Sequence, residues 1–325
     1  MRKIMHMTFI LIFGVLGYFT FTSARQFVQS DWQEPMPINE VTQQYRLVLI
    51  TQDIDTPFWN EVAVGAHAQA NLDDVIIEVL GNYGRNEEVF LRNLELAIYA
   101  KVDGIIVQGL DTDEFKELTK IKAAFYGIPI ITIAHDVAME ESLRRTYVGS
   151  PQYEAGQLIA QQLVSDMGEQ GEVILFANEK NHSFQQERGA GIESVLAQYA
   201  NITVIKAETT DVREDILATT QQLLNDYPQI KGFISIDANL TAGLIQEISR
   251  RRQVDSLYIY SFDDHADIQP LLSQKRINAV IAQDPVAMGR TSVQVMIEWL
   301  KGETVPLDSE GYFTDISILK AVDES

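Results

Sequence analysis

Several short apolar runs of this sequence end directly in polar side chains. Carboxylates accept hydrogen bonds, whereas the amides of Asn and Gln both donate and accept them. A group of such side chains suits a neutral, polyhydroxylated ligand. Helix N-capping by Asp and Asn is the alternative for each segment taken alone. The segments are 51–55, 134–136, 237–239, 263–265 and 283–284.

An aromatic pair and one arginine add binding chemistry to these segments. Phe58 and Trp59 follow Pro57, just after the first polar segment. We expect Trp59 to stack on an apolar ligand face and Phe58 to pack partly, although a first-turn core contact also fits Pro57. Arg188 lies early in an expected helix. Its planar guanidinium suits adjacent ring oxygens, with a surface ion pair to a neighbouring glutamate as the alternative.

The sequence carries no motif for catalysis or metal binding. It has no cysteine, and its five histidines lack the spacing of metal ligands. The nucleophile-elbow, zinc-protease, phosphate-loop and dinucleotide-binding patterns are also absent from it. We therefore expect a protein without enzymatic activity, cofactor or metal. The formal net charge of −21 repels phosphate backbones, so we expect no nucleic-acid partner.

Short apolar, β-branched runs alternate with longer amphipathic stretches from residue 46 onward. Runs that stay apolar along their length indicate strands buried on both faces, as in a parallel sheet. The alternation predicts an α/β fold of repeated strand–helix–strand units. The expected strands are 46–51, 75–80, 103–107, 128–133, 172–176, 202–206, 232–236, 257–262 and 277–282. The clearest expected helices are 87–100, 152–167, 213–224 and 284–300.

The length of the chain, 325 residues, exceeds that of one ordinary domain of about 100–200 residues. We therefore expect the strands to divide into two sheets. Ligands of open parallel sheets bind beyond the carboxyl ends of the strands. The polar segments should accordingly converge on one cleft.

The amino terminus combines a basic start with an uncharged apolar stretch. Arg2 and Lys3 precede residues 5–22, which carry no charged side chain. About 18–20 apolar residues cross a bilayer, and basic residues ahead of a span stay on the cytoplasmic side. We expect residues 1–24 to form a transmembrane anchor, with a cleaved signal sequence or a buried core helix as alternatives. Residues 25–44, with Pro35 and Pro37, indicate a linker to an extracytoplasmic domain.

Short motifs follow one another in a characteristic order along the rest of the chain. They are 55–59 (DTPFW), 102–107 (VDGIIV), 127–132 (GIPIIT), 148–150 (VGS), 154–156 (EAG), 187–189 (ERG) with Gly191, 262–263 (FD) and 281–285 (IAQDP) with Gly289. Together they resemble the type I periplasmic binding protein family, in its ribose- and sugar-binding branch. That branch shares its fold with the effector domains of LacI-type repressors. The resemblance covers residue 45 to the C-terminus.

The resemblance implies two Rossmann-like parallel-sheet lobes joined by a three-segment hinge, with the ligand in the cleft between them. The implied crossings lie near 149–152, 281–284 and 308–312. Lobe one is then 45–149 plus 284–309, and lobe two is 150–283 plus 310–325. The expected ligand-binding residues are Asp55, Phe58, Trp59, His135, Asp136, Arg188, Asp211, Asp237, Asp263 and Gln283.

Two of these positions depart from the family pattern. Asp211 stands where an aromatic residue is common, which puts stacking from that side in doubt. Ala134 and His135 replace a frequent Asp-Arg pair that grips hydroxyls near the anomeric end of the sugar. The ligand therefore differs from ribose, or Asp136 takes over the role of the lost pair.

The implied function is that of an extracytoplasmic, membrane-anchored or secreted receptor for a monosaccharide or related polyol. Closure on the sugar would either present it to an ABC permease or signal to a membrane histidine kinase. A transmembrane helix suits the kinase role, since the chain lacks the cysteine that often tethers delivery proteins through a lipid. The alternative is a protein-interaction or sensing module of the same fold with no sugar ligand.

Overall fold

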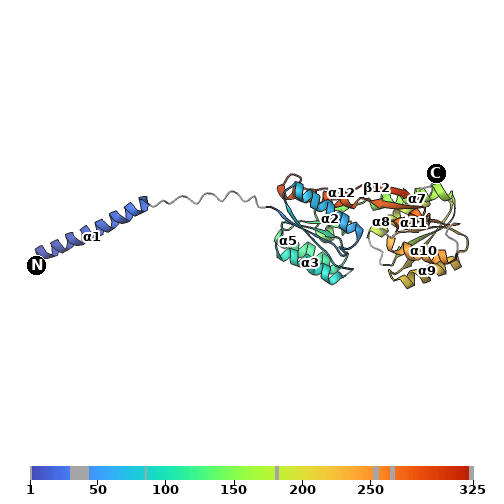
Figure 1. Ribbon diagram of the computed structural model, residues 1–325, viewed down its shortest axis with the longest axis horizontal. Coiled ribbons are helices and arrows are strands. Elements are labelled where there is room, and N and C mark those ends of the chain that lie inside the picture. The colour runs from blue at the N-terminus through green and yellow to red at the C-terminus, as the bar shows by residue number, and fades with distance from the viewer. Residues whose placement is uncertain are drawn as a thin grey trace. The chain divides into compact units, whose positions relative to one another are not determined.

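The computed structural model describes residues 2–29, 44–84, 86–179, 183–251, 256–263 and 268–321, without the side chains of 2–5, 8–10 and 26–29. The chain divides into two units, Met1–Gln44 and Tyr45–Ser325. The first unit contains helix α1 (Arg2–Gln29) (Figure 1). Among the residues described, no helix meets the length and apolarity that a bilayer crossing needs. Helix α1 continues past residue 24, and the rest of the expected linker, residues 30–43, lies outside the described residues.

Lobe one of the second unit is built on a six-stranded sheet in the order β11-β5-β4-β3-β1-β2. All neighbouring strands in it are parallel. Strands β3 and β4 are buried along their whole length, as unbroken apolar runs require. The strands are β1 (Arg46–Ile50), β2 (Ile76–Leu80), β3 (Gly104–Gln108), β4 (Ile130–Ile133), β5 (Thr146–Gly149) and β11 (Tyr312–Phe313).

Helices cover both faces of this sheet. One core joins the sheet to α2 (Pro57–Leu72) and α12 (Pro285–Lys301). The opposite core joins it to α3 (Glu87–Tyr99), α4 (Asp113–Glu117) and the π-helical segment η1 (Leu118–Ala123). Two short helices, α5 (Ala124–Tyr126) and α6 (Met139–Ser142), complete the lobe.

Lobe two repeats the same three-layer plan. Its six-stranded sheet has the order β12-β10-β9-β8-β6-β7, and only β12 of these strands runs antiparallel to its neighbour. One core includes α7 (Gln152–Met167) and α8 (Ser183–Leu196), and the other includes α9 (Arg213–Asp226), α10 (Ala238–Arg250) and α11 (Gln269–Ser273). The strands are β6 (Gln170–Asn178), β7 (Asn201–Thr209), β8 (Ile230–Ser235), β9 (Tyr258–Phe262), β10 (Ala279–Gln283) and β12 (Ile316–Lys320).

Helices α7 and α8 pack with their backbones in close approach. A Cβ atom on Gly156 of α7 would lie 2.1 Å from the carbonyl oxygen of Arg188 on α8. A Cβ on Gly191 of α8 would lie 2.1 Å from the carbonyl oxygen of Tyr153 on α7. Only glycine allows this approach, so these two positions set where α8 lies against the lobe.

The expected fold class, two parallel-sheet α/β lobes, is confirmed by the two sheets. Every apolar run named in the sequence overlaps an observed strand, although several strand ends differ from the expected bounds, and helix α7 has the expected bounds. Strands β5, β11 and β12 match none of these runs. Strands β5 and β11 are very short, and their pairing with a neighbour rather than an apolar run defines them.

The chain crosses between the lobes after β5, after β10 and after β11. The third crossing lies at residues 314–315, later than the expected 308–312. Tyr312 and Phe313 pair with β5, and the Thr314 amide donates to the Gly149 carbonyl at 2.8 Å. These bonds keep the chain in lobe one up to Thr314.

Candidate ligand-binding site

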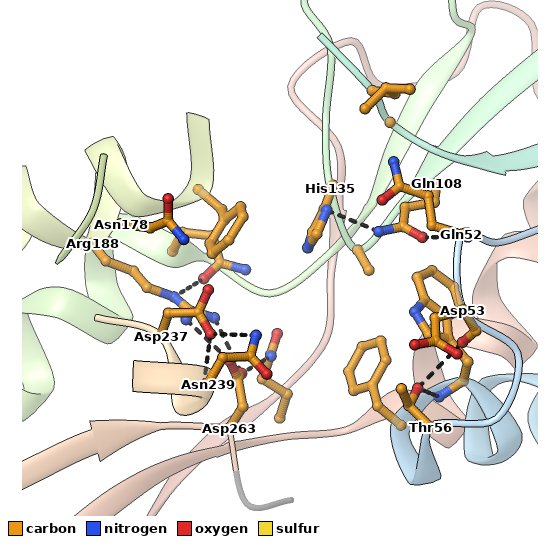
Figure 2. A pocket seen from close by; sticks show the side chains of 18 of the residues that line it. Gln52, Asp53, Thr56, Gln108, His135, Asn178, Arg188, Asp237, Asn239 and Asp263 are labelled. Atoms are coloured by element: carbon orange, nitrogen blue, oxygen red, sulfur yellow. Dashed lines mark hydrogen bonds and ion pairs between the residues drawn. The ribbon is translucent and has the colours of Figure 1, made fainter. Parts of the chain in front are cut away.

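A cavity of about 520 Å³ lies where the carboxyl ends of the strands in the two lobes face each other (Figure 2). That volume is typical of small-molecule sites, which range over about 300–1,000 Å³. Lobe one contributes Gln52, Asp53, Thr56, Phe58, Trp59, Gln108, Gly109, Leu110, Ala134 and His135. Lobe two, including the end of β10, contributes Gln152, Asn178, Phe184, Arg188, Asp211, Asp237, Asn239, Asp263 and Gln283.

The guanidinium of Arg188 is the centre of the lobe-two wall. Its side chain is buried, and two nitrogens donate to the two Asp263 carboxylate oxygens at 3.1 and 3.2 Å. Nε donates to Gln152 Oε1 at 2.7 Å, and Nη1 also donates to the Ile236 carbonyl at 2.9 Å. Because the fork is held from several sides, its orientation is set before any ligand arrives.

Aromatic rings hold the same guanidinium on its faces. The Arg188 Cζ lies 4.4 Å from the Phe262 ring centroid and 5.1 Å from that of Phe184. Such cation–π contacts favour a charge that has been removed from water. Gln283 donates from Nε2 to Asp263 Oδ1, so the carboxylate is shared between an arginine and an amide.

The remaining lobe-two groups are carboxylates and amides. Asp237 Oδ1 accepts from both the backbone and the side-chain nitrogen of Asn239 at 2.9 Å, and Oδ2 accepts from Gln185 Nε2 at 3.3 Å. Asn178 donates from Nδ2 to Asp211 Oδ1. Asp237 also caps the N-terminus of α10. The sequence left helix capping and ligand-site lining as alternatives for this residue, and in the structure Asp237 does both.

The lobe-one wall carries the aromatic pair. Phe58 and Trp59 meet edge to face, with centroids 5.3 Å apart and planes at 86°. Trp59 is buried in the lobe-one core and Phe58 is only partly buried, yet both line the cavity. Thr56 caps α2 by accepting from the Trp59 amide at 3.3 Å, which fixes the start of this helix.

Gln108 and His135 occupy the other side of this wall. Gln108 Nε2 lies 3.0 Å from His135 Nδ1 (Figure 2). The His135 ring stacks on Phe184 of lobe two, with centroids 4.6 Å apart and planes at 15°. A second contact joins the lobes here, since Ser183 Oγ donates to the Asp136 carbonyl at 3.3 Å.

Two cavity residues have left-handed backbone conformations. Ala134 and Asp263 each have φ of 63° at the carboxyl end of a strand. Such conformations are uncommon outside glycine and concentrate at functional sites. The buried Tyr147 hydroxyl donates to the Ala134 carbonyl at 3.0 Å, and burial raises its pKa well above the usual range. Tyr147 therefore remains a donor that holds this turn.

The structure brings together eight of the ten expected site residues, because Asp55 and Asp136 do not line the cavity. Asp55 is exposed on the loop before α2. Asp136 is engaged by lobe one itself, since it accepts from Thr132 Oγ1 at 2.5 Å and from Arg144 Nη2 at 2.7 Å. That buried arginine holds the carboxylate away from the cavity.

Sequence reasoning missed several lining residues. Gln108 and Asn178 are the last residues of β3 and β6, so the strand-end rule that selected the other segments applies to them as well. Gln152 and Phe184 lie at the starts of α7 and α8. Only the packing of those helices brings them to the cavity.

Comparison with known proteins places this architecture in a family. The protein-family model described as "Periplasmic binding protein domain" matches residues 47–304 of the sequence. This chain belongs to the periplasmic binding protein family. As a member of its sugar-binding branch it is a binding protein and not an enzyme, and the family implies an extracytoplasmic location.

Individual relatives of this periplasmic binding protein agree with that assignment. The ribose import binding protein RbsB of Bacillus subtilis is 19% identical over 265 residues, covering 81% of this chain and 84% of the relative. GanP, a glucose-galactose binding protein from Geobacillus stearothermophilus, is 28% identical with a TM-score of 0.79, covering 86% of this chain and 98% of GanP. The structure of a XylFII-LytSN complex shares the fold at 24% identity and a TM-score of 0.72, covering 86% of this chain and 98% of the matched chain.

Proposed function

We propose that this periplasmic binding protein binds one monosaccharide, or a related polyol, in the cavity between its lobes. The observation that carries the proposal is the composition of the cavity wall. Carboxylates, amides and one guanidinium from both lobes surround it, beside an aromatic pair. A sugar offers hydroxyls that donate and accept together with apolar C–H faces, so this wall matches it on both counts.

Each wall has its own role in the proposed complex. Phe58 and Trp59 stack on the apolar face of the ring. Asp237, Asp211 and Asp263 accept from hydroxyl groups, and Arg188 and Gln283 donate to them. Asp55 and Asp136 are left out of the set because neither lines the cavity.

The proposed response to ligand is closure of the two lobes. Ligand contacts come from both lobes, so a bound sugar favours the arrangement in which both walls reach it. Three crossing segments provide the hinge. Closure changes the outer surface of the protein, which a membrane partner can recognise.

We further propose that the N-terminal segment tethers this protein to the membrane, with the lobes outside the cytoplasm. The support is the uncharged stretch 5–22 behind Arg2 and Lys3. The partner is an ABC permease that receives the sugar or a sensor histidine kinase that reads closure. The existence of a XylFII-LytSN complex shows that one structural neighbour assembles with a second protein, which favours a protein partner here.

A second candidate function is a protein-interaction module without a sugar ligand. Polar groups of the cavity already bind one another, as in the Arg188–Asp263–Gln283 and Asn178–Asp211 contacts. A cavity whose side chains satisfy each other needs no ligand for its stability.

A test of sugar binding distinguishes the sugar receptor from the protein-interaction module. The full-length protein, purified in detergent, is heated with D-ribose, D-xylose, D-glucose, D-galactose, D-allose or myo-inositol. Binding to the folded state raises the Tm by mass action, and the rise grows with ligand concentration. A saturable rise with one ligand that disappears in Asp237→Asn, but remains in Asp226→Asn on the exposed surface of α9, supports the receptor. A well-folded protein whose Tm responds to none of these ligands favours the interaction module.

Partner capture then separates transport from signalling. Membranes of the native cell are extracted with and without the sugar, and the full-length protein is recovered with whatever binds it. Sugar-dependent recovery of a permease supports delivery. Recovery of a histidine kinase supports signalling.

A further inference from the structure

A buried amide next to the cavity determines the hydrogen-bonding character of His135. Gln108 is buried, and its Oε1 lies 2.9 Å from the backbone nitrogen of Gln52 and 3.1 Å from Thr51 Oγ1. A backbone N–H can only donate, so the atom that faces it must be the amide oxygen. The orientation of the Gln108 amide is therefore settled by the main chain of lobe one.

The other end of the amide then sets the tautomer of the imidazole. Gln108 Nε2 carries two hydrogens and no lone pair for acceptance, and it lies 3.0 Å from His135 Nδ1. Nδ1 must accept this hydrogen bond, so the ring proton resides on Nε2. An imidazolium would bring a second donor against the amide.

The ring has little freedom to turn away from this partner. Its face stacks on Phe184 at a centroid distance of 4.6 Å. Its backbone is held by two hydrogen bonds, from the Gly109 amide to the His135 carbonyl at 2.9 Å and from the His135 amide to the Ile133 carbonyl at 2.7 Å. Figure 2 shows the imidazole between Gln108 and the open centre of the cavity.

We propose that Gln108 is a positioning residue that makes His135 a hydrogen-bond donor to the ligand through Nε2–H. The proposal rests on the proposed function and adds a rule of specificity to it. The lobe-two wall presents carboxylates, which accept. His135 presents a donor on the lobe-one side, so the ligand atom there must be an acceptor, such as a ring or hydroxyl oxygen, and cannot be an ammonium group.

Charged groups near the His135 ring can affect any measurement in which pH is varied. On the same loop Asp136 is paired with Arg144. On α8, which carries Phe184, Glu187 and Arg188 follow within one turn, and Arg188 is bound to Asp263. These groups are shared by all variants below, so differences between variants report on residue 108.

The first experiment observes the tautomer without any ligand. The full-length protein is labelled with ¹⁵N-histidine, and its ring nitrogens are correlated with their carbon-bound protons at pH 7.5. His135→Asn identifies the His135 signals. We expect His135 Nδ1 to show the ¹⁵N chemical shift of an unprotonated nitrogen, and Nε2 to show the ¹⁵N chemical shift of a protonated nitrogen. A protonated Nδ1, or two nitrogens averaged by tautomer exchange, overturns the proposal.

Substitution of Gln108 should switch this signature. In Gln108→Glu the carboxylate only accepts, so neutral His135 should move its proton to Nδ1. Gln108→Met keeps the size and removes the donor, so the two tautomers should average. Gln221→Glu makes the same chemical change on the exposed surface of α9 and should leave the His135 signals unchanged. The Tm of each variant verifies that it is folded, and an unaltered tautomer in folded Gln108→Glu contradicts the assignment.

Affinity as a function of pH tests whether the donor is used. D-Ribose, D-xylose and D-galactose serve as probes between pH 6 and 9. In Gln108→Glu the imidazolium still carries Nε2–H but the neutral ring does not, so affinity should fall about tenfold as pH rises, the value of one hydrogen bond. The natural protein should show no such fall. A flat profile in Gln108→Glu shows that the ligand does not use the donor. Absence of binding by every protein instead rejects the proposed function, while the ring spectra still decide the role of Gln108.

Discussion

At the scale of single residues, the cavity is organised around a buried ion pair. Arg188 and Asp263 make a two-point contact, and Arg188 is further held by Gln152 and by the Ile236 carbonyl. A buried charge without its partner is costly, because neither water nor another group replaces the lost interaction. The pair therefore contributes to the stability of lobe two as well as to the shape of the cavity.

Replacing Asp263 with asparagine should separate these two contributions. The amide of Asp263→Asn retains one acceptor oxygen but loses the charge opposite Arg188, so we expect a loss of about 2–3 kcal/mol in unfolding free energy. Urea unfolding of the full-length protein measures it. Asp226→Asn, on the exposed surface, should cost less than about 0.5 kcal/mol. Equal stability of the two variants would show that Arg188 does not depend on its carboxylate.

In the proposed complex, Arg188 also determines ligand geometry through the shape of its side chain. Arg188→Lys keeps the charge but replaces a fixed planar fork by a single ammonium group. We expect sugar affinity to fall at least about tenfold, since one charge-assisted hydrogen bond is worth about 1.5–3 kcal/mol. Isothermal titration with whichever sugar raises the Tm in the screen proposed above measures the change. Lys206→Arg, on the exposed end of a pair with Glu193, should leave affinity unaltered.

At the scale of elements, the packing of α8 against α7 determines where two cavity-lining residues lie. Arg188 and Phe184 both lie on α8, and the close approach at Gly156 is to the Arg188 carbonyl itself. Any enlargement at Gly156 must move this part of α8. Gly189, on the same helix, is a matched contrast, since an added Cβ there would find its nearest atom at 3.8 Å.

The two glycines should therefore respond in opposite ways to alanine. Gly156→Ala should lower the unfolding free energy by about 1–3 kcal/mol, as overpacking does, and weaken sugar binding because Arg188 is displaced. Gly189→Ala should leave binding intact and stabilise the helix by up to about 1 kcal/mol. Thermal unfolding and titration calorimetry on both variants test the pair. Equal effects of the two substitutions would mean that helix contact does not position Arg188.

At the scale of the whole molecule, like charges from the two lobes face each other beside the His135–Phe184 contact. Partial burial raises the pKa of the Glu187 carboxyl, and the carboxylates of Asp136 in lobe one and Glu154 in lobe two raise it further. The folded protein therefore holds this proton more tightly than the unfolded chain does. Folding stability falls as pH rises above the unfolded value of about 4.3 and through the folded pKa, then stays lower.

Glu187→Gln removes this penalty at neutral pH. We expect the Tm of the variant to exceed that of the natural protein at pH 7–8 and the difference to shrink toward pH 4. Thermal unfolding across this range is the measurement. Glu193→Gln, on the same helix but paired with Lys206, should bring no gain. A Tm difference independent of pH would show that repulsion and burial of Glu187 are not its cause.

The sequence alone was enough to predict the two-sheet fold, part of the candidate site and the family. Unbroken apolar runs such as those in β3 and β4 require burial on both faces, which permits few arrangements other than a covered parallel sheet. Because the carboxyl ends of such strands share one edge, Asp237, Asp263 and Gln283 were assigned to one site from their place in the chain. The order of short motifs was enough to indicate the family.

Only the tertiary structure decided which polar side chains face the cavity. Asp136 belongs to the same polar segment after β4 as His135, yet Arg144 binds it inside lobe one while His135 reaches the cavity. Phe184 and Gln152 gave no local signal, because helix packing brings them to the site. The proton on His135 Nε2 follows from Gln108, a residue 27 positions away. Local patterns determine which elements form and where they end, whereas hydrogen bonds between distant residues determine what each side chain has left to offer a ligand.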